Sequence, residues 1–402
     1  MKIALLLLLS GSLAAFAGDT LTEKPDPQAA GMNPERLAMI PVRMREYVDA
    51  GKTAGVVTIV ARHGHVASFD AVGYQELEGR TPLRTDTIFR IMSMTKPVSC
   101  AAIMVLVDEG RVALIDPVEK YLPEFKGLQV NPCAGRAGSY HCGLHAPTRP
   151  VNIQDLMTHT SGLPGTAPRP SGNPAQTLAE SVGDAAHATL LFEPGTSWNY
   201  SQIGYAALGR IIEVVTKQSF DRFVADRILM PLGMKDTFFF IPPGKESRIA
   251  AAYTYQPDGL KRVNTPVLKY PTPQGGLFST ALDMLRFHQM MLNKGTLDGR
   301  RVLSAAAVES MTASQTGQME QVGFAPGVGH GFGFEVVREV SGTFRGNSIG
   351  SYVKGGAYRT YGWVDPAKDL TGILMMQRTN GGGDTADEIN SFLSLAAGAI
   401  DK

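Results

Sequence analysis

The chain is poor in cysteine, tryptophan and net charge, and it has only one long apolar run. Its 402 residues include three cysteines and two tryptophans, and the formal charge is +1. A nearly neutral protein without a basic stripe is a poor binder of nucleic acids and anionic membranes. Hydrophobic residues at 44% and charged residues at 19% are typical of a compact globular protein. We therefore expect a small-molecule partner and no nucleic acid.

The one long apolar run lies at the N-terminus. A positive start at residues 1–2 precedes the apolar stretch 3–9, and Ala-Phe-Ala at 15–17 forms a small-x-small cleavage site. This pattern predicts a secretory signal peptide over residues 1–17. A membrane anchor needs roughly 20 apolar residues, and the polar residues at 10–12 interrupt the run too early. We expect a periplasmic or secreted protein without stable membrane insertion.

The three cysteines have different sequence surroundings. Cys133 and Cys142 bracket a glycine-rich stretch, and in an oxidising compartment this favours a disulfide. The alternative is a metal site that also uses His141 and His145, but the spacing matches none of the usual zinc-ligand pairs. Cys100 lies among apolar residues and is predicted to be a buried thiol. We expect no metal and no organic cofactor.

Hydrophobic periodicity places strands at both ends of the chain and helices in the middle. It predicts a strand hairpin at 55–61 and 65–72 and later strands at 333–338, 358–364 and 370–376. It predicts helices at 34–50, 97–109, 153–157, 203–215, 221–228, 281–292 and 385–399.

This order of elements predicts an α/β fold of the α+β type. The N- and C-terminal segments would form one antiparallel sheet flanked by helices, with a mostly helical domain inserted between them. In the mature unit, residues 18–402, the mixed part would cover about 30–92 and 265–402, and the helical part about 93–264.

The sequence Ser93-Met94-Thr95-Lys96 opens one of the predicted helices. On a helix, residues three apart are neighbours, so the lysine amine can contact the serine hydroxyl and take its proton. The chain holds a second pair at this spacing, Ser351 and Lys354, within a stretch typical of a strand. Residues three apart on a strand point to opposite faces. Only Ser93 and Lys96 are therefore expected to cooperate, with Ser93 as an acyl-transfer nucleophile.

Three motifs together resemble a known superfamily. They are Ser93-Met94-Thr95-Lys96, Trp198-Asn199-Tyr200-Ser201 and Lys354-Gly355-Gly356. The chain resembles the serine β-lactamases and penicillin-binding proteins, in their class C-like branch, and most closely the β-lactamase-like carboxylesterases. The resemblance runs from about Gly31 to the C-terminus, and it implies the β-lactamase or DD-peptidase fold.

The resemblance implies a role for each motif residue. Ser93 would be acylated, Lys96 would help to deprotonate it, and Tyr200 would transfer protons to and from the leaving group and water. The amides of Ser93 and Ala357 would form the oxyanion hole. Whether Lys96 or Tyr200 removes the first proton stays open, because the two would titrate as a coupled pair. His159 is expected to be a hydrogen-bonded structural histidine.

Two departures from the family pattern bear on the substrate. The Tyr-x-Asn element reads Tyr200-Ser201-Gln202, and the Lys-Thr-Gly element reads Lys354-Gly355-Gly356, without its hydroxyl. Lys354 would keep some attraction for a carboxylate, and Gln202, Gly355 and Gly356 would also contact the substrate. Trp198 either lines the acyl pocket or packs in the core.

These features favour an exported serine hydrolase that cleaves carboxylic esters (EC 3.1.1), with weak turnover of β-lactams (EC 3.5.2) allowed. One alternative is a class C-like β-lactamase or D-alanyl-D-alanine peptidase. The other is a non-catalytic cell-wall-binding homologue, which would have no need of the serine, lysine and tyrosine together. The sequence does not predict the oligomeric state.

Overall fold

A computed structural model gives the fold. It describes residues 19–131, 133, 143–167, 175–265, 268–319, 322–323, 325–340, 346–379 and 387–401. The predicted signal peptide lies outside the described residues, and so do His141 and Cys142. The predicted Cys133–Cys142 disulfide therefore stays a prediction. Within the described ranges, no group of three or more histidine, cysteine, aspartate or glutamate side chains could hold a metal ion.

An eight-stranded antiparallel sheet joins the two ends of the chain. Its strand order is β10-β11-β12-β13-β14-β1-β2-β3. The N- and C-terminal segments meet where β1 pairs with β14, with Ile59 opposite Ile373. This confirms the predicted fold class. The strands are β1 (Gly55–Arg62), β2 (His65–Glu76), β3 (Thr81–Pro82), β10 (Val328–His330), β11 (Glu335–Val337), β12 (Tyr352–Gly355), β13 (Tyr361–Asp365) and β14 (Leu370–Met375).

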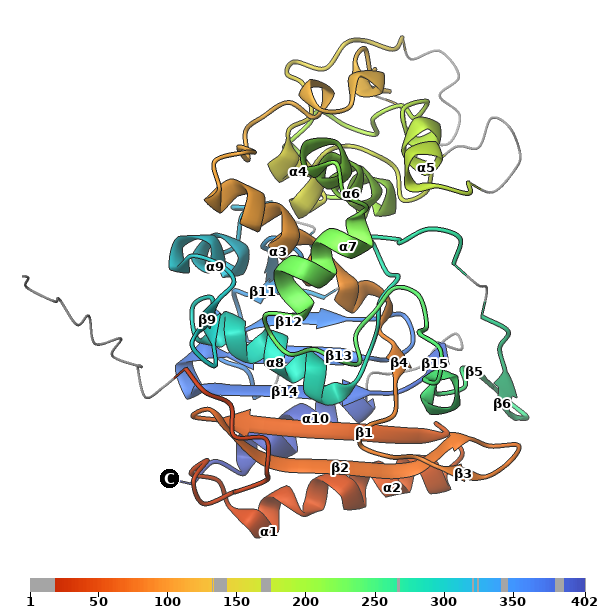
Figure 1. Cartoon of the computed structure of the whole chain (residues 1–402), viewed down its shortest axis with the longest axis vertical. Helices are drawn as coiled ribbons and strands as arrows, with labels where there is room; N and C mark the ends of the chain where they lie inside the picture. The colour runs from red at the N-terminus through yellow and green to blue at the C-terminus, as the bar shows by residue number, and fades with distance from the viewer. Residues whose placement is uncertain are drawn as a thin grey trace, which may run out of the picture.

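Helices cover both faces of the sheet, as Figure 1 shows. On one face lie α1 (Pro34–Leu37), α2 (Met39–Asp49) and α10 (Asp387–Gly398). The other face carries α8 (Ala281–Leu292), and beyond it the remaining helices: α3 (Thr95–Asp108), α4 (Ile153–Thr158), α5 (Leu178–Ala185), α6 (Gln202–Thr216), α7 (Phe220–Val224) and α9 (Ala305–Thr312).

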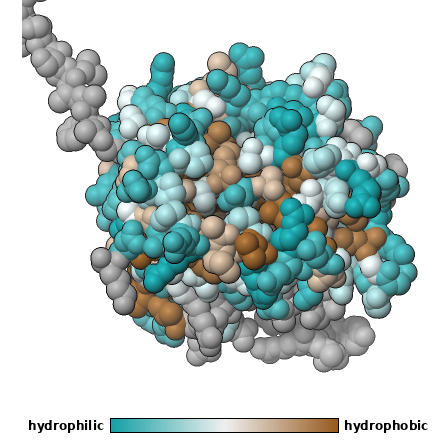
Figure 2. Space-filling view, turned by 90° about the horizontal axis from the view of Figure 1, so that it is seen from below, coloured by the Kyte–Doolittle hydropathy of each residue, from teal (hydrophilic) through white to brown (hydrophobic). Residues whose placement is uncertain are grey.

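Alternate side chains of the central strand β1 serve two separate cores. Along β1, Val57 and Ile59 pack into the core shared with the helical part, whereas Val56 and Val60 pack against α2 and α10. The outer face of α2 and α10 shows apolar side chains scattered among hydrophilic ones (Figure 2). Among the helices that the structure describes, none has both the length and the apolar character that a bilayer crossing requires.

Smaller pairings complete the described part of the fold, and the sequence did not predict them. A three-stranded sheet orders its strands β15-β5-β6, and two short ribbons pair β4 with β7 and β8 with β9. These strands are β4 (Phe89–Arg90), β5 (Tyr253–Gln256), β6 (Gly259–Arg262), β7 (Phe278–Ser279), β8 (Thr296–Leu297), β9 (Arg300–Arg301) and β15 (Arg378–Thr379).

Several predicted elements differ in detail from the structure. Strand β2 runs four residues past the predicted end at 72, and β11 is shorter than the predicted strand 333–338. The first predicted helix divides at Ala38 into α1 and α2. The predicted helix 221–228 continues past α7 as a single π-helical stretch, Ala225–Leu229. The strand predicted at 358–364 begins only at Tyr361, because Arg359 has a positive φ of 64° and closes a turn before it.

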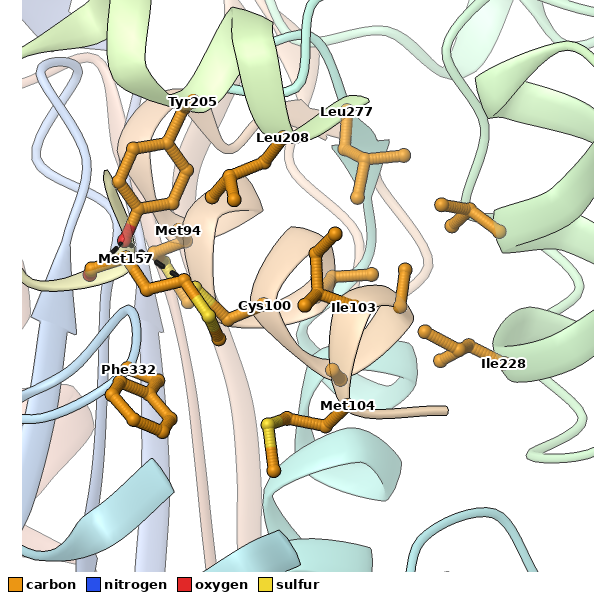
Figure 3. Packing of buried hydrophobic residues seen from close by; sticks show 14 of the residues in the cluster. Met94, Cys100, Ile103, Met104, Met157, Tyr205, Leu208, Ile228, Leu277 and Phe332 are labelled. Atoms are coloured by element: carbon orange, nitrogen blue, oxygen red, sulfur yellow. Dashed lines mark hydrogen bonds between the residues drawn. The ribbon is translucent and has the colours of Figure 1, made fainter. Parts of the chain in front are cut away.

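The buried helix α3 anchors the part of the molecule that carries Ser93. Figure 3 shows Cys100 and Ile103 of α3 on the side that faces Tyr205 and Leu208 of α6, whereas Met104 extends away from them. Cys100 is a free, fully buried thiol, as predicted, and burial raises its pKa to about 12. A helix enclosed in this way holds its first turn in a fixed position.

Candidate active site

Ser93 lies in a 3₁₀ turn, Met92–Met94, that leads directly into α3. Neighbouring segments hold this turn through Ile91, whose amide donates to the Leu277 carbonyl at 3.0 Å. The Ile91 carbonyl accepts a hydrogen bond from Thr360 Oγ1, also at 3.0 Å. Met92 has a φ of +49°, a conformation that costs energy in a residue with a side chain. The serine thus sits on a constrained turn and is half-buried.

Lys96 occupies the first turn of α3 and is only 1% exposed. Its Nζ donates to Ser93 Oγ at 3.2 Å and to the Gln274 carbonyl at 2.7 Å. The predicted contact between residues three apart is therefore present. Burial lowers the pKa of Lys96 to about 8, and the nearby Lys354 ammonium acts in the same direction. A lysine with this pKa can give up its proton near neutral pH and serve as a base.

Tyr200 reaches Ser93 from the start of α6. Its hydroxyl donates to Ser93 Oγ at 2.8 Å. Burial alone would raise the pKa of Tyr200, but the ammonium groups of Lys354 and Lys96 outweigh it and lower the pKa below its ordinary value. Their nitrogen atoms lie 5.1 and 4.6 Å from the centre of the Tyr200 ring. The structure thus brings the three predicted catalytic side chains together on one oxygen atom.

Lys354 lies on β12 and is buried beside the carboxylate of Glu335, which the sequence pattern did not predict. Its Nζ lies 3.6 Å from Oε1 of Glu335, at the start of β11, and the two side chains are 2% and 11% exposed. Glu335 therefore offsets part of the positive charge of Lys354. A glutamate within a short strand carries no local signal of this role, because the contact depends on how β11 pairs with β12.

The turn after β12 lies against the Ser93 turn. A Cβ atom on Gly356 would be 2.2 Å from the Ile91 carbonyl oxygen and equally close to Thr360 Oγ1, so only glycine fits there. The amide of Gly356 donates to the Thr360 carbonyl at 2.7 Å. The close contact between Gly356 and Ile91 brings the exposed Ala357, the residue after Gly356, near the turn that carries Ser93. The oxyanion-hole role of Ser93 and Ala357 stays a prediction.

The other predicted substrate contacts surround the same region. Trp198 is half-buried, and its ring centre is 6.2 Å from that of Tyr200. Gln202 is exposed as the first residue of α6, and its backbone N–H donates to the Gly165 carbonyl. Gly355 ends β12 opposite Tyr361. The roles of these residues in substrate binding stay predictions.

Two buried imidazoles lie behind Tyr200. His159, which ends α4, is fully buried, and its ring centre is 4.5 Å from that of Tyr200. Its Nδ1 accepts the Ser201 amide at 3.1 Å, so it is hydrogen-bonded, as predicted. His330 of β10 lies 5.0 Å from His159, ring centre to ring centre. No local sequence pattern predicts that His330 lies here, because the two histidines are far apart in the chain.

Comparison with known proteins identifies the family of the chain. The family model described as Beta-lactamase matches residues 43–395. The chain belongs to this beta-lactamase family. It is 36% identical to Protein Rv1367c of Mycobacterium tuberculosis, covering 83% of this chain and 88% of that protein. It is 28% identical to Esterase EstB of Burkholderia gladioli, covering 81% and 86% respectively.

A solved structure shares the fold of this family member. It is that of EstCE1, described as a hydrolase with promiscuous acyltransferase activity, with a TM-score of 0.75. The match covers 91% of this chain and 99% of EstCE1 at 22% identity, so it bears on the fold alone. Family and relatives together make the chain a serine hydrolase, in the esterase-like branch that the motifs indicate.

The pKa of Lys96 leads to a pH prediction. If neutral Lys96 is the base, kcat/KM of the enzyme should rise with pH through a midpoint near 8, because the ammonium form cannot accept the serine proton. Lys96→Arg should lower kcat by about a hundredfold or more, since arginine stays protonated. Steady-state rates measured across this range check both. A flat profile, or an active arginine variant, would exclude Lys96 as the base.

Proposed function

We propose that this protein is an exported serine esterase that cleaves carboxylic esters through an acyl-enzyme on Ser93. The observation that carries the proposal is the pair of hydrogen bonds to Ser93 Oγ, from Lys96 Nζ at 3.2 Å and from the Tyr200 hydroxyl at 2.8 Å. A hydroxyl in contact with a basic amine and an acidified phenol is an activated nucleophile.

In the proposed reaction, Ser93 Oγ attacks the ester carbonyl carbon while its proton passes to the Lys96–Tyr200 pair. The amides of Ser93 and Ala357 stabilise the negative oxygen of the tetrahedral intermediate. That intermediate collapses as the C–O bond to the alcohol breaks, and Tyr200 protonates the departing oxygen. A water molecule then attacks the acyl-enzyme carbonyl carbon and gives up a proton to the same pair. The bond between that carbon and Ser93 Oγ breaks, the pair returns a proton to Oγ, and the free acid leaves.

The charges around the site support a neutral ester over a carboxylate-bearing substrate. Glu335 stands 3.6 Å from the Lys354 ammonium and weakens its attraction for a substrate carboxylate. Gly355 provides no side-chain hydroxyl to hold such a group. The relative EstB, an esterase, points the same way.

The second candidate is a class C-like β-lactamase or D-alanyl-D-alanine peptidase. It is favoured by the retained Lys354, which lies buried 5.1 Å from the Tyr200 ring and keeps a positive charge beside the nucleophile. A non-catalytic wall-binding role is disfavoured, because binding alone does not require three converging proton-transfer groups.

The substrate class can be tested with Ser93→Ala. The wild-type enzyme should hydrolyse p-nitrophenyl butyrate faster than a chromogenic cephalosporin and form an acyl adduct visible by intact mass. Ser93→Ala should lose both the ester activity and the adduct. The matched control is Ser351→Ala, which alters the serine of the second Ser-x-x-Lys pair and should stay active. Residual ester hydrolysis by Ser93→Ala would refute the mechanism, and preference for the cephalosporin would favour the second candidate.

Glu335→Gln tests whether Glu335 weakens the attraction of Lys354 for a substrate carboxylate. We compare p-nitrophenyl hemisuccinate with p-nitrophenyl butyrate, because the acyl groups differ mainly in a terminal carboxylate. Freeing Lys354 from its partner should raise the hemisuccinate-to-butyrate ratio of kcat/KM by roughly tenfold. Glu339→Gln, which removes an exposed glutamate just beyond β11, is the control and should leave the ratio unchanged. An unaltered ratio in Glu335→Gln would show that Glu335 does not set the charge preference.

Export is proposed from the pattern of residues 1–17. When the full chain is produced in a Gram-negative host, N-terminal sequencing of the periplasmic protein should begin at Gly18. Recovery of the protein only in the cytosol with Met1 or Lys2 at its N-terminus would contradict export.

A further inference from the structure

His159 carries its proton on a defined ring nitrogen. Its Nδ1 accepts the amide hydrogen of Ser201, and a nitrogen that accepts cannot also hold a proton. Burial, followed by the neighbouring His330, Lys354 and Lys96, holds the pKa of His159 well below its usual value, so the ring is neutral. A neutral imidazole has one proton, which must therefore be on Nε2.

His330 has the opposite tautomer. Its Nδ1 lies 2.8 Å from the carbonyl oxygen of Gly331, which can only accept, so Nδ1 must carry the proton. Burial, with the Lys354 charge next in weight, lowers the pKa of His330 to about 3, and this ring is also neutral. Its Nε2 is therefore an unprotonated acceptor.

The two remaining nitrogen atoms are complementary. Both Nε2 atoms are fully buried and have no hydrogen-bond partner among the residues that the structure describes. The rings meet at 81° with centres 5.0 Å apart. One nitrogen is a donor and the other an acceptor, and buried polar atoms are rarely left without a partner. The backbone contact at each Nδ1 thus leaves a hydrogen-bond donor at Nε2 of His159 and an acceptor at Nε2 of His330.

We propose that His159 Nε2–H donates to Nε2 of His330 through one bridging water, and that this link positions Tyr200. The link would fix the orientation of the His159 ring. That ring packs against the Tyr200 ring, and its Nδ1 accepts the backbone N–H of Ser201, the residue that follows Tyr200. Without the link, rotation of His159 would release both contacts. His330 is then a positioning residue that acts on the phenol through His159, a role that rests on the proposed function of Tyr200.

Nuclear magnetic resonance tests the tautomers without any reference to activity. In long-range ¹H–¹⁵N spectra of the full chain labelled with ¹⁵N-histidine, His159 should show a protonated Nε2 and His330 a protonated Nδ1. Single substitutions at each position assign the signals. Identical tautomers, or a cationic ring at neutral pH, would overturn the proposal even if the protein is an esterase. Opposite tautomers in a protein without esterase activity would leave the link intact and refute the proposed function instead.

Two variants at His330 separate positioning from packing. His330→Phe keeps an aromatic ring but removes the acceptor, and it should lower kcat for p-nitrophenyl butyrate about tenfold with little change in KM. In that variant the His159 signals should no longer show a single Nε2-protonated form. His330→Gln can place an amide oxygen near the former Nε2 and should recover most of the rate.

The control is His288→Gln, in α8, which removes another buried imidazole whose Nδ1 lies 2.7 Å from the Met284 carbonyl. This variant should retain the wild-type kcat. Equal loss of rate in His330→Phe and His330→Gln would refute the positioning role. If His330→Phe does not fold, the wild-type tautomers and His330→Gln still decide the question.

Discussion

One oxygen atom, Ser93 Oγ, receives hydrogen bonds from an amine and a phenol, and the surrounding structure serves to keep them there. The amine comes from the first turn of α3 and the phenol from the residue before the N-cap of α6. Since the two helices are far apart in sequence, their packing decides whether the three groups meet. The apolar contacts between α3 and α6 seen in Figure 3 therefore hold the chemistry in place as well as the core.

Two buried ammonium groups, those of Lys96 and Lys354, lie in the site. Burial makes the ammonium form of Lys96 costly, and Lys354 adds to that cost, which is why the pKa of Lys96 falls to about 8. The same two ammonium groups favour the phenolate and lower the pKa of Tyr200. Glu335 moderates this field at Lys354, while His159 and His330 fill the space behind the phenol as neutral rings. The pKa values of Lys96 and Tyr200 and the preference for a neutral or a charged substrate thus depend on the same neighbouring charged groups.

Local rules of helix and strand geometry predicted much of this structure. Helical spacing identified the Ser93–Lys96 contact, and strand alternation correctly set aside Ser351, which lies next to β12. The β-branched hairpin at the N-terminus and the late strands predicted a shared sheet, which the pairing of β1 with β14 confirms. In these cases the signal lay within a few neighbouring residues, where backbone periodicity determines which side chains meet.

The remaining features depend on tertiary contacts that have no local signature. Glu335 and His330 are single polar residues in short strands. The pairing of β11 with β12 brings Glu335 to Lys354, and His330 of β10 meets His159 at the end of α4 only through tertiary packing. The turn that delays β13 to Tyr361 likewise brings Gly356 against the carbonyl of Ile91, which is distant in the sequence. Such contacts become visible only when segments distant in the sequence are packed together.

The most direct measurement is the rate at which a fluorophosphonate labels the full-length enzyme, with the modified residue identified by peptide mass spectrometry. Ser93 should be the residue labelled, and Lys96→Met and Tyr200→Phe should each slow its labelling by at least about tenfold. Label on another residue, or unchanged labelling rates in both variants, would mean that the hydrogen bonds to Ser93 Oγ do not activate it.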